Sequence, residues 1–378
     1  LLIERNEQAP MSDEYPLMAF ISNEGVAPKG DRYDRSSLVS DTENKPYKRT
    51  DFGDFIYSSN NLETGSIGLN KYGKASISPV YSIFQPTGIA DSDFLGRRLV
   101  RKDFINAMVK WRQGVIYGQW RIHESDFIKI EIPVPSVDEQ RKIGAFLDGL
   151  DNLITLHQRK YDKLQNVKKS MLEKMFPKNG RNIPEIRFAG FTDAWEQRKF
   201  SEIVTPYADP IPTPTDGYFR LGIRSHAKGT FHSYVRAGME LETAQMHRVA
   251  ADKFIVNITF GWEHAVAITD ENDAGKLVSH RFPQFSFNTG MVPSYFKFAI
   301  TDENFRHHLW LASPGGAGRN RVLKIDEMLE YKFWVTSADE QLRIAQFLER
   351  LDNLITLHQR ELEKLKNLKK ACLEKMFV

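Results

Sequence analysis

The chain has 378 residues, of which 41% are hydrophobic and 27% charged, and its formal net charge is +3. This composition excludes a disordered or fibrous protein, and the length predicts two or three domains. The single cysteine, Cys372, excludes a disulfide framework or a zinc cluster within the chain. The sequence has no signal peptide and no apolar run of the ~18 residues that a membrane span needs, so we expect a cytoplasmic protein. The nearly balanced charge permits a nucleic-acid partner without requiring one.

Residues 1–135 are expected to form a first globular α/β head, with short strands separated by glycine-containing turns. Strands are predicted at Tyr15–Ile21, Phe52–Tyr57, Ser76–Phe84 and Phe127–Val134, and a helix near Arg101–Trp111. A loop rich in Gly, Arg and Gln, Arg112–Arg121, precedes the last strand, and such side chains bond to phosphates and base edges. The DNA-contact candidates are Ser58, Asn60, Asn61, Lys71, Lys74, Arg97, Arg101, Arg112, Gln113, Tyr117, Gln119, Trp120 and Arg121. At each position the alternative is an ordinary solvated surface residue.

Residues 136–178 carry the pattern of one long amphipathic helix. Apolar positions recur every three or four residues with charged residues between them, which is typical of a coiled-coil seam. The seam is predicted to contain Leu150, Ile154, His157 and Leu164, and Pro177 and Gly180 end the helix. A helix of about 30 residues is roughly 45 Å long.

Residues 179–336 are expected to form a second α/β head whose sequence differs from the first. Strands are predicted at Phe254–Thr259, Ala265–Ile268 and Tyr331–Val335, and a helix at Ser294–Leu311. The Gly- and Arg-rich loop Ser313–Arg321 again precedes the last strand. The DNA-contact candidates in this head are Arg220, Arg224, Trp262, Glu263, His264, Ser313, Arg319, Asn320 and Arg321, with the same alternative for each.

Residues 337–378 repeat the first helix. Ser136–Phe176 aligns with Ser337–Phe377 without a gap, with 27 identities in 41 positions at a period of 201 residues. The second seam is predicted to contain Leu351, Ile355, His358 and Leu365. Neither seam can be buried alone, so we expect the helices to pack on each other as an antiparallel pair with pseudo-twofold symmetry and a head at each end. We expect His157 and His358 to be packed in the seam, without a metal or catalytic role.

Four lysines at equivalent positions of the two helices are predicted to point outward. They are Lys168, Lys169, Lys369 and Lys370. We expect them to face a partner or DNA phosphates, and a solvated helix face is the alternative.

The opening of the second head, Ile183–Phe200, has no counterpart in the first copy. At the repeat period Leu1 corresponds to Glu202, so the first copy is expected to start about 20 residues inside its repeat. We interpret the chain as trimmed at its N-terminus.

Signatures of catalysis are missing from the sequence. It has no tetrad for amino-group methylation, no Gly-rich cofactor loop after a first strand, no nuclease constellation and no helicase motif. The segment Gly68–Ala75 resembles a phosphate-binding loop, but it ends in Ala75 where the magnesium ligand needs a hydroxyl. We therefore predict no catalytic residues, no metal site and no cofactor bound by this chain.

The order of motifs resembles the specificity subunit of type I restriction–modification systems. Pro184-Glu-Ile-Arg-Phe188 and Trp195-Glu-Gln-Arg-Lys199 open a head, and a Gly- and Arg-rich loop precedes its last strand. Pro133-Val-Pro135 leads to Asp138-Glu-Gln140 and Ile143, matched by Thr336, Asp339-Glu-Gln341 and Ile344 in the second copy. Each helix closes with Leu-Glu-Lys-Met-Phe. The resemblance covers essentially the whole chain, and it departs from the family in the missing first opening and at Val335-Thr336.

This resemblance implies four parts: target recognition domain 1 at 1–135, a helix at 136–178, target recognition domain 2 at 179–336 and a helix at 337–378. Each head would read half of a split, asymmetric DNA site. The helices would set the spacer and dock two methyltransferase subunits that bind S-adenosylmethionine and methylate adenine after flipping the base. Restriction subunits would add ATP- and Mg²⁺-dependent translocation and cleavage. A rod of roughly 45 Å also exceeds one DNA turn of about 34 Å.

Two other classes of function remain open at this stage. One is a protein-interaction scaffold with two ligand-binding heads and no DNA, which the weak net charge favours and the Arg-, Asn- and Gln-rich loops oppose. The other is an enzyme in its own right, which the missing catalytic signatures oppose.

Overall fold

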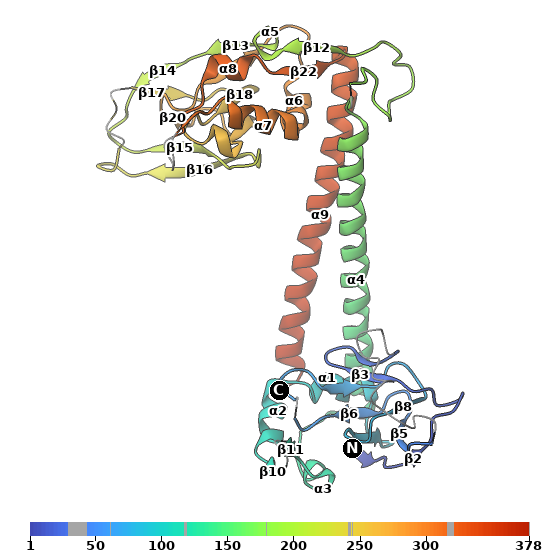
Figure 1. Ribbon diagram of the computed structural model, residues 1–378. Coiled ribbons are helices and arrows are strands. Elements are labelled where there is room, and N and C mark those ends of the chain that lie inside the picture. The colour runs from blue at the N-terminus through green and yellow to red at the C-terminus, as the bar shows by residue number, and fades with distance from the viewer. Residues whose placement is uncertain are drawn as a thin grey trace. The chain divides into compact units, whose positions relative to one another are not determined.

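The computed structural model describes residues 1–28, 44–60, 62–116, 119–178, 180–240, 243, 245–315 and 321–377, without the side chains of 113–120. The chain divides into unit 1, Leu1–His157 with Glu361–Val378, and unit 2, Gln158–Arg360. Each unit contains one head and a part of both long helices, α4 (Val137–Lys174) and α9 (Ala338–Met376), which are labelled in Figure 1. The mixed α/β class predicted from the sequence is confirmed. None of the helices in the described ranges could cross a membrane.

Unit 1 is built on a four-stranded antiparallel sheet with the order β1-β9-β6-β7. Its strands are β1 (Leu2–Glu4), β9 (Ser82–Pro86), β6 (Phe55–Tyr57) and β7 (Ile67–Leu69). A three-stranded sheet adds β2 (Gln8–Ala9), β5 (Tyr47–Thr50) and β8 (Ala75–Ile77). Two hairpins are β3 (Ala19–Ile21) with β4 (Gly25–Ala27), and β10 (Gln113–Ile116) with β11 (Gln119–Arg121). The short helices are α1 (Ser92–Arg98), α2 (Lys102–Val109) and α3 (Glu124–Phe127).

Unit 2 repeats this plan. Its four-stranded antiparallel sheet contains β13 (Val204–Tyr207), β21 (Gln284–Phe287), β18 (Lys253–Val256) and β19 (Val266–Ile268), in that order. A five-stranded sheet has the order β14 (Pro210–Pro212), β17 (Gln245–Arg248), β20 (Leu277–Val278), β15 (Tyr218–Ile223) and β16 (Thr230–Val235). A further pair joins β12 (Glu196–Lys199) to β22 (Lys332–Val335). The short helices are α5 (Phe200–Ile203), η3 (Gly261–Glu263), α6 (Pro293–Ala299), α7 (Glu303–Leu311) and α8 (Ile325–Leu329).

The two heads share one fold although their sequences differ. The sheet β1-β9-β6-β7 corresponds to β13-β21-β18-β19, and β2-β5-β8 corresponds to β14-β17-β20. Helix α1 packs on β7 as α6 packs on β19. Hairpin β3–β4 adjoins β8 through a parallel bridge at Leu17 and Ser76, as β15 adjoins β20. The duplication visible in the helices therefore extends through both heads.

Four sequence predictions of secondary structure are wrong. The predicted strand Ser76–Phe84 is two strands, β8 and β9, which belong to different sheets. Phe127–Val134 is not a strand, because α3 ends at Phe127 and the following residues have no strand partner among the described ones, whereas β12 pairs with the equivalent β22. The predicted helix Ser294–Leu311 is two helices, and the Asp302 side chain caps the second one by accepting from Asn304 N. The predicted loop Arg112–Arg121 contains hairpin β10–β11.

Within each unit the two long helices run antiparallel. In unit 1 Lys369 Nζ lies 2.5 Å from an Asp151 oxygen, and in unit 2 Lys168 Nζ lies 2.5 Å from an Asp352 oxygen. The eight predicted seam residues are all buried or half-buried: Leu150, Ile154, His157, Leu164, Leu351, Ile355, His358 and Leu365. The expectation that Lys168 and Lys369 point outward is wrong, because their ammonium groups pair with carboxylates of the other helix.

A glutamine at the start of each long helix fixes the head to that helix. Gln140 Oε1 accepts from Asp91 N at 2.9 Å, and its Nε2 donates to the carbonyl oxygens of Ile89 and Pro135. The equivalent Gln341 makes the same three bonds, to Val292 N and to the carbonyl oxygens of Gly290 and Thr336. Both glutamine side chains are almost fully buried. Each bond gives a partner to a part-buried backbone group beside a helix start.

Candidate nucleic-acid interface

In unit 2 the side chain of Arg321 lies between two tryptophans, an arrangement that we call the Arg321 stack. Its guanidinium carbon is 4.9 Å from the Trp310 ring centroid and 5.9 Å from that of Trp262. His307 stacks on Trp310 at 6.0 Å with the rings 13° from parallel. Cation–π attraction orients the guanidinium, whose planar fork of donors suits a phosphate or a guanine edge.

Local structure explains why these side chains meet. Trp262 belongs to η3 and Trp310 to α7, and these two elements contact each other. Just after Arg321, Leu323 N donates to Ile258 O at 2.8 Å, and its side chain is buried in the core. Arg321 therefore lies two residues before Leu323, whose position is fixed by the core. The Trp310 side chain is 44% exposed.

Hairpin β15–β16 presents a second surface of exposed aromatic rings. Phe219 and Tyr234 are each 56% exposed, and their rings meet edge to face with centroids 5.1 Å apart. Arg224 lies over the Phe231 ring at 5.4 Å, and Arg220 is half-buried on β15. Exposed aromatic faces next to arginines can stack on bases and pair with phosphates. The sequence reasoning selected the arginines and missed the rings, which the alternation within Tyr218–Ile223 could have indicated.

Three candidates in unit 2 have structural contacts instead. His264 is 3% exposed, and its Nε2–H donates to Ile300 O at 2.8 Å. Burial lowers the pKa of His264, so the imidazole is neutral at physiological pH. Ser313 is 1% exposed and donates to Leu309 O, and Glu263 accepts a hydrogen bond from Ser225 Oγ at 2.6 Å. Buried groups cannot reach DNA, so His264 and Ser313 are corrected to structural residues and Glu263 is left out of the candidate surface.

In unit 1 two of the selected arginines bind the long helices. Arg97 pairs with Asp148 and lies 2.9 Å from Asp151, both on α4. Arg101 donates to the Leu373 carbonyl of α9 and lies over the Phe377 ring at 5.7 Å. We therefore correct both from DNA contacts to residues that fix the head to the helices.

Several other basic side chains of unit 1 form ion pairs at the surface. Arg112 makes two bonds to Glu63, at 2.8 and 2.7 Å, and this hydrogen bonding lowers the pKa of the Glu63 carboxyl. Lys74 pairs with Glu14, and Lys71 lies 3.1 Å from Asp93. The pairs of Lys71 and Lys74 are exposed and therefore weak, so a DNA phosphate can replace the carboxylate. The Arg112 side chain is only 12% exposed and is held by two bonds.

The remaining candidates of unit 1 differ in accessibility. Ser58 is 7% exposed and is corrected to a core residue, Asn60 is half-buried, and the Arg121 side chain is 64% exposed. Trp111, which sequence reasoning did not select, is 38% exposed, and Lys129 lies 5.9 Å from its ring centroid. Asn61, Tyr117, Arg319 and Asn320 lie outside the described residues, as do the side chains of Gln113, Gln119 and Trp120.

The described parts of the chain contain no group of three or more His, Cys, Asp or Glu residues placed to hold a metal ion. Among the described residues, the titratable groups that lie close together form ion pairs or structural hydrogen bonds. The arrangement is therefore suited to binding through arginines and aromatic rings.

Comparisons with known proteins agree in pointing to one family. Residues 20–166 match the model described as the type I restriction modification DNA specificity domain. The type I restriction enzyme MjaVIII specificity subunit of Methanocaldococcus jannaschii is 23% identical over 321 residues, which cover 81% of this chain and 74% of that protein. The putative MjaX specificity subunit of the same organism is 22% identical over 67% of this chain and 60% of its own length. The crystal structure of the type I restriction-modification S subunit from M. genitalium matches with a TM-score of 0.54 at 12% identity, covering 100% and 96% of the two chains, which indicates a common fold.

Proposed function

Because this chain is a type I restriction–modification DNA specificity subunit, and not itself a catalyst, we propose that its two heads read the two halves of one bipartite, asymmetric DNA site. The observation that carries this proposal is that the two heads share one backbone fold but differ in the side chains on their surfaces. Both heads have the same sheet order, and a buried glutamine, Gln140 or Gln341, fixes each of them to a long helix by the same hydrogen bonds. Their exposed side chains nevertheless differ. Two readers of one design with different surfaces suit a target whose halves are unlike. We also propose the four-part division at residues 135, 178 and 336.

In unit 2 we propose that the Arg321 stack and hairpin β15–β16 contact DNA. Both surfaces combine exposed aromatic rings with arginines that the rings hold in place. In unit 1 the corresponding candidates are Arg112, Arg121 and the exposed lysines Lys71 and Lys74. On binding, DNA phosphates would replace the carboxylates that now pair with these basic side chains. DNA binding is therefore expected to weaken as the salt concentration rises.

We propose that the outer faces of the long helices dock two methyltransferase subunits. Leu153 and Leu156 are 44% and 45% exposed, and the equivalent Leu354 and Leu357 are 43% and 52% exposed. All four lie in residues 151–159 and 352–360, two segments of identical sequence, so each helix presents the same apolar pair. Paired leucines exposed on a helix suit a protein partner better than water. Two equal faces suit two copies of one partner.

The partners would supply the chemistry in the cytoplasm, where the host DNA lies. We propose that the methyltransferase subunits bind S-adenosylmethionine and methylate adenine, and that restriction subunits use ATP and Mg²⁺. We also propose that the helices determine the spacer between the half-sites, because helix length is fixed at 1.5 Å per residue.

Selection of DNA from a random pool by the chain in complex with a methyltransferase subunit tests the proposal. The proposal expects enrichment of one split motif with a fixed gap, and replacement of residues 1–135 by another head should alter one half alone. Absence of any enriched sequence, with the complex intact, would instead favour the interaction scaffold.

A further inference from the structure

The opening segment of the second head, residues 182–201, packs against the rest of unit 2 through four side chains. Arg187 makes two bonds to the buried Glu340 carboxylate, at 2.7 and 2.8 Å. Phe188 meets Phe347 edge to face at 5.9 Å.

Further along the same opening, Trp195 packs beside an aromatic pair. Its ring lies 6.1 Å from Phe176 and 6.2 Å from Tyr295, and it is 2% exposed. Phe200 is fully buried between Phe305 and Phe333, and β12 pairs with β22 along the same line. One continuous segment therefore makes every one of these contacts.

Unit 1 contains the receptor for each of the four side chains, but none of the described residues occupies those places. At the 201-residue period Glu340 corresponds to Glu139, which is exposed, and Phe347 corresponds to Phe146, which is 45% exposed. The stacked pair Phe176–Tyr295 corresponds to Phe377–Phe94, whose centroids are 5.0 Å apart. At these matching positions unit 1 has an exposed phenylalanine and a carboxylate that has no partner among the described residues, which marks a surface built to be covered.

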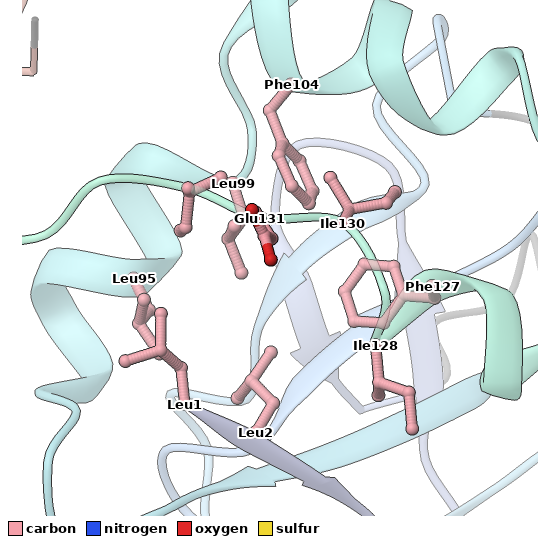
Figure 2. A pocket seen from close by; sticks show the side chains of 10 residues that line it. Leu1, Leu2, Leu95, Leu99, Phe104, Phe127, Ile128, Ile130 and Glu131 are labelled. Carbon is pink, nitrogen blue, oxygen red and sulfur yellow. The ribbon is translucent and has the colours of Figure 1, made fainter.

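The place of Phe200 is an open apolar pocket of about 360 Å³ in unit 1 (Figure 2). Phe104 and Ile132, the counterparts of Phe305 and Phe333, line it together with Leu1 and Leu2. Ile130 and Glu131 also line it, where the chain enters residues 131–134, the irregular stretch equivalent to β22. The pocket thus combines an apolar cavity for a ring with backbone that can accept an added strand.

We propose that this surface of unit 1, formed by Glu139, Phe146, the Phe94–Phe377 pair and the pocket, is a docking surface for a segment with the sequence of residues 182–201. The occupant pairs as a strand with residues 131–134, inserts a phenylalanine into the pocket and places an arginine on Glu139. Its chain direction follows unit 2, where Phe200 leads into Ile203 and β13. The proposal is independent of DNA binding.

The test joins a second copy of residues 182–201 directly ahead of Leu1 in the full chain. Hydrogen exchange of the backbone amides of residues 128–132 and of Val134 is then measured by mass spectrometry, since Pro133 has no amide hydrogen. We expect exchange to slow by about ten-fold or more, because amides of a paired strand open only with the local structure. The matched control carries Phe200→Ala and Arg187→Ala in the added copy alone, and Phe146→Ala in the receptor is a second control. Both are expected to restore most of the fast exchange.

Equal slowing by a scrambled copy of the segment would overturn the proposal, since any added chain would then suffice. Unchanged exchange with the true copy would also overturn it. Slowing that appears without the added copy as protein concentration rises would assign the surface to a second chain. None of these outcomes depends on whether the protein reads DNA.

Discussion

Lys369 Nζ lies 2.5 Å from an Asp151 oxygen, and Lys168 Nζ lies at the same distance from Asp352. The two pairs are related by the 201-residue repeat, and each belongs to a different unit. They differ in one respect, because Asp151 also receives Arg97 of head 1 at 2.9 Å. Asp151 thus ties together both helices and the head of unit 1.

The Asp151→Asn variant should show a pH-dependent loss of stability. Burial alone would raise the pKa of Asp151, but hydrogen bonds from Lys369 and Arg97 outweigh it and leave the pKa lowered. A carboxyl with a lowered folded-state pKa stabilises the protein above its unfolded pKa, near 3.9, and loses that contribution as pH falls through the folded value. The wild type should therefore exceed the variant by about 1 kcal/mol or less at neutral pH, since half-exposed pairs are screened, and the gap should close in acid.

Urea unfolding of both proteins between neutral and acid pH measures this gap. Asp352→Asn is the matched control, because Asp352 pairs with Lys168 at the same distance and has no arginine among its described contacts. A gap for Asp151→Asn that stayed constant down to the lowest pH would show that its ion pairs contribute nothing.

Gln341→Ala should destabilise the protein by about 1–3 kcal/mol, because it removes a buried side chain and its three hydrogen bonds to part-buried backbone groups of Gly290, Val292 and Thr336. Gln140→Ala should cost a similar amount in unit 1. Gln346→Ala, at an exposed position of α9, is the control and should change the unfolding free energy little. Thermal and urea unfolding measure the change in unfolding free energy. Equal changes for the Gln341 and Gln346 variants would contradict the stabilising role of the Gln341 hydrogen bonds.

The sequence revealed the repeat and both long helices because apolar periodicity over about four heptads is a strong local signal. It could not identify the partners of Arg97 and Arg101, which lie on helices 51 and 272 residues away in the sequence. Both were therefore interpreted as DNA contacts. Phe127–Val134 alternates like a strand, yet a strand forms only where a neighbour pairs with it, as β12 does with β22. The Arg321 stack joins Trp262, Trp310 and Arg321 through tertiary packing that no spacing indicates.

Arg321→Ala should weaken DNA binding of the assembled complex by about 1–3 kcal/mol and relax sequence preference in one half-site. The matched control is Arg306→Ala, on exposed α7 and paired only locally with Glu303 among the contacts described. Titration of labelled DNA carrying changes in either half-site separates the effects. Loss spread evenly over both half-sites would mean that Arg321 contacts phosphate without reading a base.

Replacing Leu153 and Leu156 together by Asp should remove one of two methyltransferase subunits from the complex, because charged groups would be buried against an apolar partner surface. Replacing Leu354 and Leu357 should remove the other, and all four changes should abolish assembly. Asn152→Asp and Asn353→Asp add a charge at neighbouring exposed positions and should leave the stoichiometry at two. Mass photometry of co-expressed complexes gives the count directly, and full assembly of the four-leucine variant would refute docking at this face.

The most direct test of the account is to express the chain with a type I methyltransferase subunit in a host without restriction and to map methyladenine by long-read sequencing. Two heads of one fold with different surfaces predict a single split, asymmetric motif with a fixed gap, and an exchanged head 1 should alter only one side of it. Methylation at a continuous or palindromic motif would contradict the assignment of one half-site to each head. So would a change in both halves after exchange of a single head.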